Sequence, residues 1–180
     1  MFKLFWLDME MTGLDVDKEV IIEAAAIVTG ATTKDHFLEP LDQYHAVVKQ
    51  PSRYLDAMDD WNKKHHKESG LVDLIPTGKD PSVVEQELIA LVDKHFSPKE
   101  RVILAGNSIG QDRQFINKYF KQLAQRLHYR MLDVSSLKIL FNNFYQISYT
   151  KKESRHRALG DIQESINELK KYLSFIQVPE

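Results

Sequence analysis

The fold is decided by the stretch at residues 2–14, which reads FKLFWLDMEMTGL. A strand is expected over residues 2–11, and its alternating side chains are apolar on both faces until the acids appear. That pattern is typical of a strand in a sheet covered on both sides. Asp8 and Glu10 are two residues apart, so they leave the same face of this strand.

The remaining apolar runs predict the layers around this strand. Runs at 20–28 and 37–48 follow after short turns and predict an antiparallel meander. Two more strands are expected at 102–105 and 130–134, with helices between them. This order predicts an α/β fold that resembles the ribonuclease-H-like folds, a mixed five-stranded sheet flanked by helices. Helices are expected from Pro51 to Gly70, from residue 81 onward, and over residues 111–123, 137–144 and 158–176. A loop is expected at residues 71–80.

Length and composition restrict the class of protein. The chain has 180 residues, of which 43% are hydrophobic and 28% charged, as expected for a single domain over residues 1–180. Its apolar stretches are far shorter than the roughly 20 residues of a membrane helix. It has no cysteine, which excludes disulfides and thiolate zinc sites. We expect a cytoplasmic protein that does not bind membranes.

The net charge of −2 restricts the kind of nucleic acid that this chain could bind. Proteins that track long nucleic acids usually have a basic surface, because phosphate neutralisation supplies most of their affinity. This chain lacks such an excess. A nucleic-acid ligand is therefore expected to be short and held by a few phosphates in a closed pocket, and no long duplex is expected.

Asp8 and Glu10 indicate a cation site at the end of the first strand. Two ionised carboxylates on one face of a buried segment repel each other and are costly to desolvate unless they share a positive charge. A hard divalent cation such as Mg²⁺ or Mn²⁺ meets that need. A strand end that simply reaches water would explain the same pair.

Three more residues make the predicted chemistry specific. Asp112 is expected on the buried face of its helix, in the first turn, where the helix dipole tolerates an anion; an ordinary N-terminal helix acid is the alternative. Asp161 lies at the edge of the apolar stripe of the last helix. His156 belongs on the basic loop before that helix, because helical positions five apart diverge by about 140°. Four carboxylates suit a two-metal displacement, and a histidine can take a proton from water at neutral pH.

In their order and on these elements, Asp8-x-Glu10, Asp112 and His156-x₄-Asp161 resemble the DEDD exonucleases of the subtype that carries histidine. Four longer stretches narrow the resemblance to the oligoribonuclease family, and it covers essentially the whole chain. They are LDMEMTGL at 7–14, MDDWN at 58–62, GNSIGQDR at 106–113 and HYRMLDVS at 128–135.

The resemblance implies a homodimer that uses two Mg²⁺ or Mn²⁺ ions per active site. Its substrates would be short RNA oligonucleotides, especially dinucleotides, degraded from the 3′ end to nucleoside 5′-monophosphates. It implies a further catalytic residue, Tyr129, which would reach into the pocket of the partner subunit. Leu14 and Trp61 would contact the bases. The 5′ phosphate would be bound by Ser108, Arg130 and Ser135, with His66 nearby.

Several alternatives stay open at this point. Trp61 could be a core aromatic, Arg130 could pair with Asp133, and His156 could be an exposed loop residue. For the function, one alternative is a related exonuclease that acts on longer DNA or RNA 3′ ends, in proofreading or tRNA trimming. The other is a catalytically silent RNA-binding module.

Overall fold

The structure is a computed structural model that describes residues 2–30, 37–150 and 157–176. Its centre is a mixed five-stranded sheet in the order β3-β2-β1-β4-β5. Three consecutive strands form the antiparallel part, and β4 and β5 join β1 in parallel. The predicted meander and mixed sheet are confirmed. The strands are β1 (Lys3–Met11), β2 (Ile21–Gly30), β3 (Glu39–Val47), β4 (Val102–Gly106) and β5 (Leu127–Asp133).

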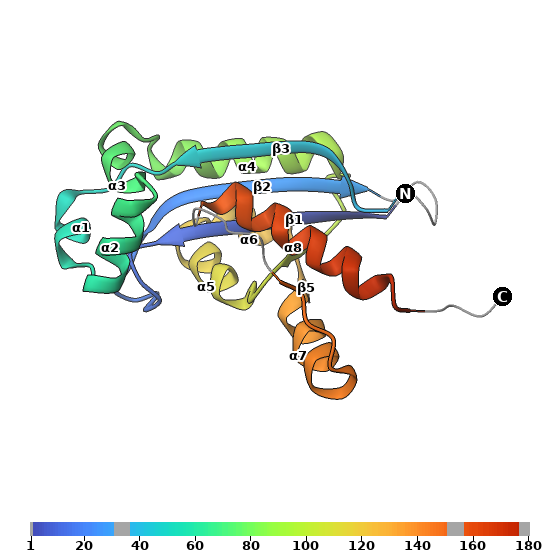
Figure 1. The fold of residues 1–180 in the computed structure, drawn as a ribbon. Coiled ribbons are helices and arrows are strands. Elements are labelled where there is room, and N and C mark those ends of the chain that lie inside the picture. The colour runs from blue at the N-terminus through green and yellow to red at the C-terminus, as the bar shows by residue number, and fades with distance from the viewer. Residues whose placement is uncertain (1, 31–36, 151–156, 177–180) are drawn as a thin grey trace.

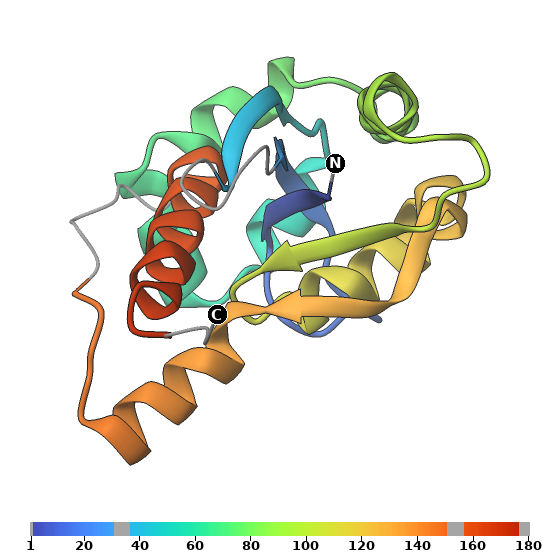
Figure 2. The same cartoon turned by 90° about the vertical axis from the view of Figure 1, so that its right-hand side faces the viewer.

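Helices cover both faces of this sheet (Figures 1 and 2). α4, α5 and α6 pack on one face, and α7 and α8 pack on the other. Within the described part of the chain, none of the helices has the length and apolar character needed to cross a membrane. The helices are α1 (Ser52–Ala57), α2 (Asp60–Glu68), α3 (Leu71–Leu74), α4 (Pro81–His95), α5 (Gly110–Tyr119), α6 (Lys121–Arg126), α7 (Val134–Tyr145) and α8 (Ala158–Leu173), with a 3₁₀ turn, η1 (Ile75–Thr77).

Strand β1 is buried on both faces, as its composition predicts. Phe5 and Leu7 pack with the helices α4, α5 and α6, whereas Leu4 and Trp6 pack with α7 and α8. Because side chains alternate, Asp8 continues the row of Leu4 and Trp6. The acids of β1 therefore face α8.

Two predicted helices are each interrupted once. Met58 adopts an extended conformation with a ψ of 146°, so α1 ends there. The side chain of Asp59 then accepts the Asn62 N–H at 2.8 Å and starts α2. The second break is at Phe120, where Glu85 of α4 accepts the N–H groups that follow and so caps α6.

The stretch 71–80 contains α3 and η1, so the expectation of a loop there was wrong. Leu71 and Ile75 are fully buried against Val20 and Ile22 in a small separate cluster. Burial of these two apolar side chains stabilises short helical turns that the Pro and Gly content does not favour. Tyr54 and Leu55 of α1 pack against the same cluster, which therefore holds α1 and α3 at the start of β2.

One buried hydrogen bond joins the side chains of β1 and β2. Trp6 Nε1 donates to Thr29 Oγ1 at 2.8 Å. We predict that Thr29→Val lowers the free energy of unfolding by about 1–3 kcal/mol, because the buried indole N–H loses its acceptor. Urea denaturation followed by tryptophan fluorescence measures the change. Thr29→Ser keeps the hydroxyl and is the control; a valine variant at least as stable as the serine variant would contradict the prediction.

Candidate active site

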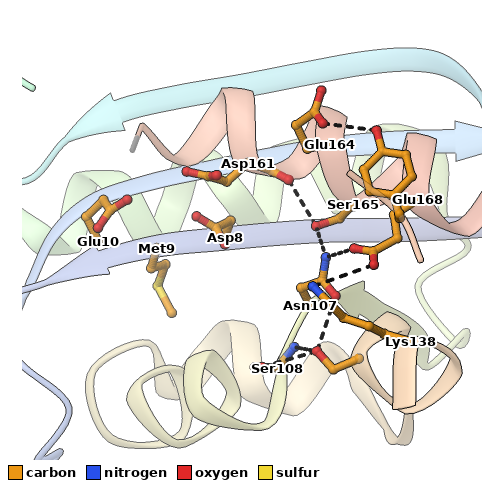
Figure 3. Close-up of a pocket in the computed structure, with 12 residues that line it drawn as sticks. Asp8, Met9, Glu10, Asn107, Ser108, Lys138, Asp161, Glu164, Ser165 and Glu168 are labelled. Carbon is orange, nitrogen blue, oxygen red and sulfur yellow. Dashed lines mark hydrogen bonds and ion pairs between the residues drawn. The ribbon is translucent and has the colours of Figure 1, made fainter. Parts of the chain in front are cut away.

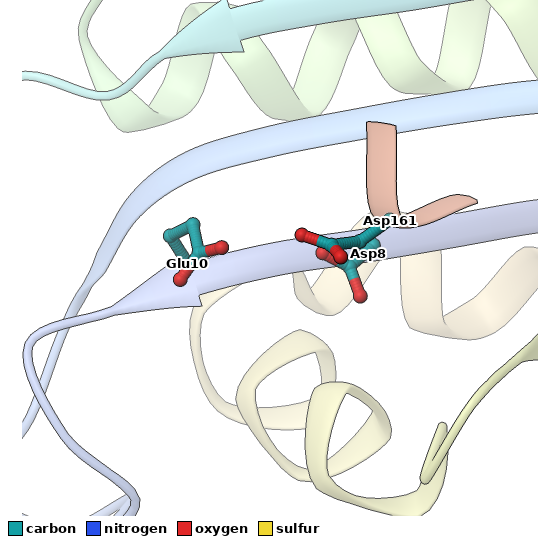
Figure 4. Close-up of side chains that lie close together, drawn as sticks. All are labelled: Asp8, Glu10 and Asp161. Carbon is teal, nitrogen blue, oxygen red and sulfur yellow. The ribbon is translucent and has the colours of Figure 1, made fainter. Parts of the chain in front are cut away.

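Three carboxylates converge between β1 and α8. Asp8 and Glu10 leave β1 on the face that α8 covers, and Asp161 reaches them from the first turn of α8 (Figure 4). One oxygen of each carboxylate lies within 4.8 Å of the others. All three residues are partly buried, so their mutual repulsion is only partly screened by water. An all-oxygen, partly desolvated acidic group of this kind fits a hard divalent cation.

The apolar face of α8 holds Asp161 at this place. Ala158 and Ile162 are buried against the sheet, and Asp161 lies between them in sequence, at the rim of the contact. Its backbone N–H donates to the Arg157 carbonyl at 3.1 Å, and its own carbonyl accepts the Ser165 hydroxyl at 2.9 Å. The first turn of α8 therefore presents the Asp161 carboxylate to Asp8.

Asp112 lies close to β1 but outside the group of three. It is buried in the first turn of α5, and its Oδ1 accepts the Met9 N–H at 2.9 Å. β4 pairs with β1 only at Phe5 and Trp6 and does not extend as far as Met9. Asp112 therefore provides the acceptor for the Met9 N–H beyond the end of this pairing. Burial raises the pKa of Asp112 to about 7, against the lowering effect of backbone donors such as Met9. A cation nearby would favour its ionised form.

A cavity of about 360 Å³ adjoins the acidic group (Figure 3). Asp8, Glu10 and Asp161 line one part of it, and Ser108 and Ser135 another. The two serine hydroxyls lie 3.2 Å apart and form a hydrogen bond with each other. The cavity thus combines an acidic end with a polar, hydroxyl-bearing end.

Ser108 has a left-handed backbone conformation, with a φ of 49°. Its N–H donates to the Asp133 carboxylate at 3.0 Å and to Ser135 Oγ at 2.8 Å, which hold this costly conformation in place. Just before it, a side chain on Gly106 would come within 3.0 Å of the Leu7 carbonyl. The close approach of β4 to β1 therefore favours glycine at this position, two residues before Ser108 in the cavity wall.

Sequence reasoning missed several residues of the cavity wall. Ser165 and Glu168 follow Asp161 by four and seven residues, a spacing that places all three on one helix face and could have identified them. Asn107 Nδ2 donates to Ser165 Oγ and Glu168 Oε2, both at 3.0 Å. Asn107 Oδ1 accepts the Ser135 hydroxyl at 3.2 Å and so links α8 to α7. The cavity wall also includes Lys138, Tyr149 and Glu164.

Leu14, Trp61 and His66 lie around the end of β1. Leu14 and Trp61 are 74% and 61% exposed, so Trp61 is not the core aromatic of the alternative interpretation. The Trp61 ring stacks on His65 at 3.8 Å between ring centroids. His66 is buried, with Nε2 3.0 Å from the Met11 carbonyl, and burial lowers its pKa. Its side chain therefore faces into the protein and supports the end of β1.

Tyr129 and Arg130 project from an irregular part of β5. Val102 pairs with Leu127 and Leu104 with Met131, so residues 128–130 bulge out opposite residue 103. Tyr129 is 75% exposed, and the Arg130 guanidinium lies 5.2 Å from the centre of its ring. Among the described residues that line the acidic cavity, neither of these two is present.

His156 falls outside the described residues. Arg157, which follows it, pairs with the buried Glu23 of β2, with 2.5 Å between the guanidinium and Oε1. The chain that leads into α8 is thereby attached to the central sheet at Arg157.

Comparison with known sequences points to one family. A family model described as an exonuclease matches residues 5–169. The chain is 43% identical to the oligoribonuclease of Shewanella sp. (strain W3-18-1) over 175 residues, which cover 95% of this chain and 93% of that protein. It is 45% identical to the oligoribonuclease of Bordetella pertussis over 173 residues, with 94% and 93% covered.

Solved structures show the same fold at low sequence identity. The nuclease domain of 3′hExo, a DEDDh family member bound to rAMP, aligns with a TM-score of 0.64 at 17% identity and covers 99% of this chain and 96% of its own. E. coli Exonuclease I in complex with a dT13 oligonucleotide aligns with a TM-score of 0.72 at 11% identity, covering 96% of this chain and 41% of its own. The predicted fold class is confirmed by these likenesses.

Repulsion among the three acids leads to a prediction about cation binding. Mn²⁺ should raise the unfolding temperature, because a cation at about 100 times its Kd stabilises the folded state by about 2.7 kcal/mol. Asp161→Asn should remove most of this stabilisation, and without a cation it should be no less stable than the wild type. Differential scanning calorimetry with MnCl₂ and with EDTA measures both effects. The control is Asp73→Asn on α3, outside the site; an equal Mn²⁺ response in the two variants would refute the assignment.

Proposed function

The chain belongs to the exonuclease family that its sequence matches and, within it, to the oligoribonucleases, and on this premise we propose that it degrades very short RNA. It is a metal-dependent 3′-to-5′ exoribonuclease, a phosphodiester hydrolase. We propose dinucleotides as preferred substrates and nucleoside 5′-monophosphates as products. The observation that carries this proposal is the group of Asp8, Glu10 and Asp161 at one end of a cavity with serine hydroxyls at the other.

The acidic residues fit the chemistry of phosphodiester hydrolysis. Two Mg²⁺ or Mn²⁺ ions, when bound by Asp8, Glu10, Asp112 and Asp161, would stabilise the charge on the attacking and leaving oxygens. β1 presents Asp8 and Glu10 from a strand paired with β2 along its whole length, so their spacing is rigid. In this proposal His156 accepts the proton of the attacking water.

The other end of the cavity fits a terminal phosphate. The hydroxyls of Ser108 and Ser135 would bind the 5′ phosphate at the end of the cavity away from Glu10, Ser135 by turning its proton from Asn107 to the phosphate. The exposed Leu14 and Trp61 would contact the two bases, and each stacked base contributes about 1–3 kcal/mol. In this scheme the buried His66 acts indirectly, by supporting the end of β1 through the Met11 carbonyl.

We also propose a homodimer in which Tyr129 acts in the active site of the partner subunit, and we propose that Arg130 binds the 5′ phosphate together with Ser108 and Ser135. Both residues project from the bulge of β5 and are exposed. Next to them, α7 carries exposed apolar side chains that a second subunit could cover. These are Ile139, Leu140, Phe144 and Tyr145.

The proposal includes a single exonuclease domain over residues 1–180 and a cytoplasmic location. The oligoribonucleases named above align with this chain over 93% of their own length, which supports one domain of this size. Neither a membrane nor a long duplex is part of the proposal. The net charge of −2 supports a short substrate.

Loss of one acid should stop turnover without loss of the fold. Asp112→Asn keeps an oxygen for the Met9 N–H, so it should fold, but it should lower turnover of a 5′-phosphorylated diribonucleotide by about 100-fold or more. Nucleotide release in Mg²⁺, followed by chromatography, measures the rate, and circular dichroism checks the fold. A normal rate in the folded variant would remove the metal-site model.

A chain-length series separates the proposed function from its closest alternative. The wild type should hydrolyse dinucleotides fastest and lose kcat/KM as the oligonucleotide lengthens. Undiminished activity on long strands with poor activity on dinucleotides would instead favour a proofreading or tRNA-trimming exonuclease.

Mixing two inactive variants tests whether Tyr129 acts across subunits. Tyr129→Ala and Asp161→Asn should each be inactive alone. A mixed dimer would contain one active site with neither change, so mixing after partial denaturation and refolding should restore turnover. If turnover stays absent although mixed dimers form, Tyr129 does not act in the partner's site.

A further inference from the structure

Glu23 is a fully buried acid for which the hydrolysis itself has no use. It lies on β2 directly opposite Glu10 of β1. Directly opposed residues point to the same face of a sheet, so Glu23 shares the face on which the acidic group lies. A buried carboxylate is costly unless it is paired and hydrogen-bonded, so its partners indicate its role.

Glu23 binds residues at the start of α8. Its Oε1 accepts a hydrogen bond from Arg157 Nε at 2.7 Å, and lies 2.5 Å from Arg157 Nη2 and 2.7 Å from His45 Nε2. Its Oε2 accepts the Ala158 N–H at 3.1 Å. Burial raises the pKa of Glu23, but the hydrogen bonds from His45, Arg157 and Ala158 outweigh it and keep the pKa below its ordinary value. The carboxylate is therefore ionised and fully committed to these partners.

These contacts supply the cap that α8 lacks in its own sequence. Arg157 is the N-cap residue, but its side chain makes no capping hydrogen bond. The first N–H groups of a helix have no partner within it. Glu23 satisfies the Ala158 N–H from a position 135 residues away in the chain. The cap is thus a tertiary contact between the central sheet and α8.

The capped turn is the one that carries Asp161. The Asp161 N–H donates to the carbonyl of Arg157, the residue that Glu23 holds. Burial of Ile162 and Ile166 sets the depth of α8 on the sheet, and Asn107 holds the next turns of the helix at Ser165 and Glu168. The first turn, which carries Asp161, is held to the sheet by Glu23. A displacement of about 1 Å is enough to disable a catalytic arrangement.

We propose that Glu23 is a positioning residue for Asp161, which locks the first turn of α8 to β2 through Arg157 and the Ala158 N–H. On the proposed function of this site, Glu23 thereby holds the Asp161 carboxylate within reach of Asp8 and Glu10 before a cation binds. β1 then places two of the acids directly, and β2 places the third through Glu23.

Glu23→Gln tests this proposal, because it keeps the volume and removes the charge that Arg157 binds. Affinity for Mn²⁺, measured by calorimetry without substrate, should fall about 10–100-fold, as is typical when a residue that orients a metal ligand is replaced. The Mn²⁺ concentration for half-maximal turnover should rise by the same factor. The KM for a diribonucleotide at saturating Mn²⁺ should stay near the wild-type value.

Changes at Arg157 test the same contact from its other side. Arg157→Gln should reproduce the loss of Mn²⁺ affinity, and Arg157→Lys, which keeps the charge, should restore part of it. The double variant Glu23→Gln with Arg157→Gln should be no worse than either single variant, because both remove one interaction. Additive losses in the double variant would overturn the proposal.

Glu87→Gln is the matched control. Glu87 of α4 accepts Tyr44 and Lys79, both at 2.7 Å, on the side of the sheet opposite α8. This variant loses a charged contact on the surface, away from the acidic group, and should bind Mn²⁺ like the wild type. The proposal fails if Glu23→Gln keeps wild-type affinity, if Glu87→Gln loses as much, or if only the number of binding-competent molecules falls.

Different results would contradict the proposed substrate and the proposed role of Glu23. If the wild type binds Mn²⁺ but does not hydrolyse dinucleotides, the proposed substrate is wrong, and the role of Glu23 is still decided by the affinities. If the wild type binds no Mn²⁺, both are wrong.

Discussion

The repulsion between Asp8 and Glu10 is the constraint on which the rest of the site depends. Two carboxylates on one face of a buried strand cannot move apart along the chain, because Asp8 and Glu10 are both paired with β2. A shift of β1 by one residue relative to its neighbours would move the two acids to the other face, but it would also expose the apolar side chains of the strand to water. The chain therefore keeps these two charges together at the cost of stability, and a cation is the natural means of relieving that cost.

The acids of this site are held from both faces of the sheet. Asp161 belongs to α8 on one face of the sheet. Asp112 belongs to α5 on the other face and accepts the Met9 N–H beyond the part of β1 that pairs with β4. Each has a second, structural attachment to the sheet: Asp112 through Met9, and Asp161 through the Arg157–Glu23 contact. A site assembled in this way is rigid because the helices that carry its ligands are also part of the core.

The sequence predicted the features that local periodicity determines. Alternation identified β1 and the face of Asp8 and Glu10, and helical spacing placed Asp161 beside the apolar stripe of α8. It could not predict the break at Phe120, which depends on Glu85 from α4, or the burial of His66, whose acceptor is the carbonyl of Met11. Glu23 was hidden for the same reason: within an apolar run, an acid gives no sign of the arginine that it will bind.

The bulge at residues 128–130 of β5 has a consequence for how this protein can associate. β5 is an edge strand, and a regular edge offers unpaired backbone groups to which another strand can add. Three residues opposite one disturb that regular spacing and twist the strand locally. A second molecule that approaches this edge therefore meets side chains, and the sheet is protected from growing by strand addition into larger aggregates.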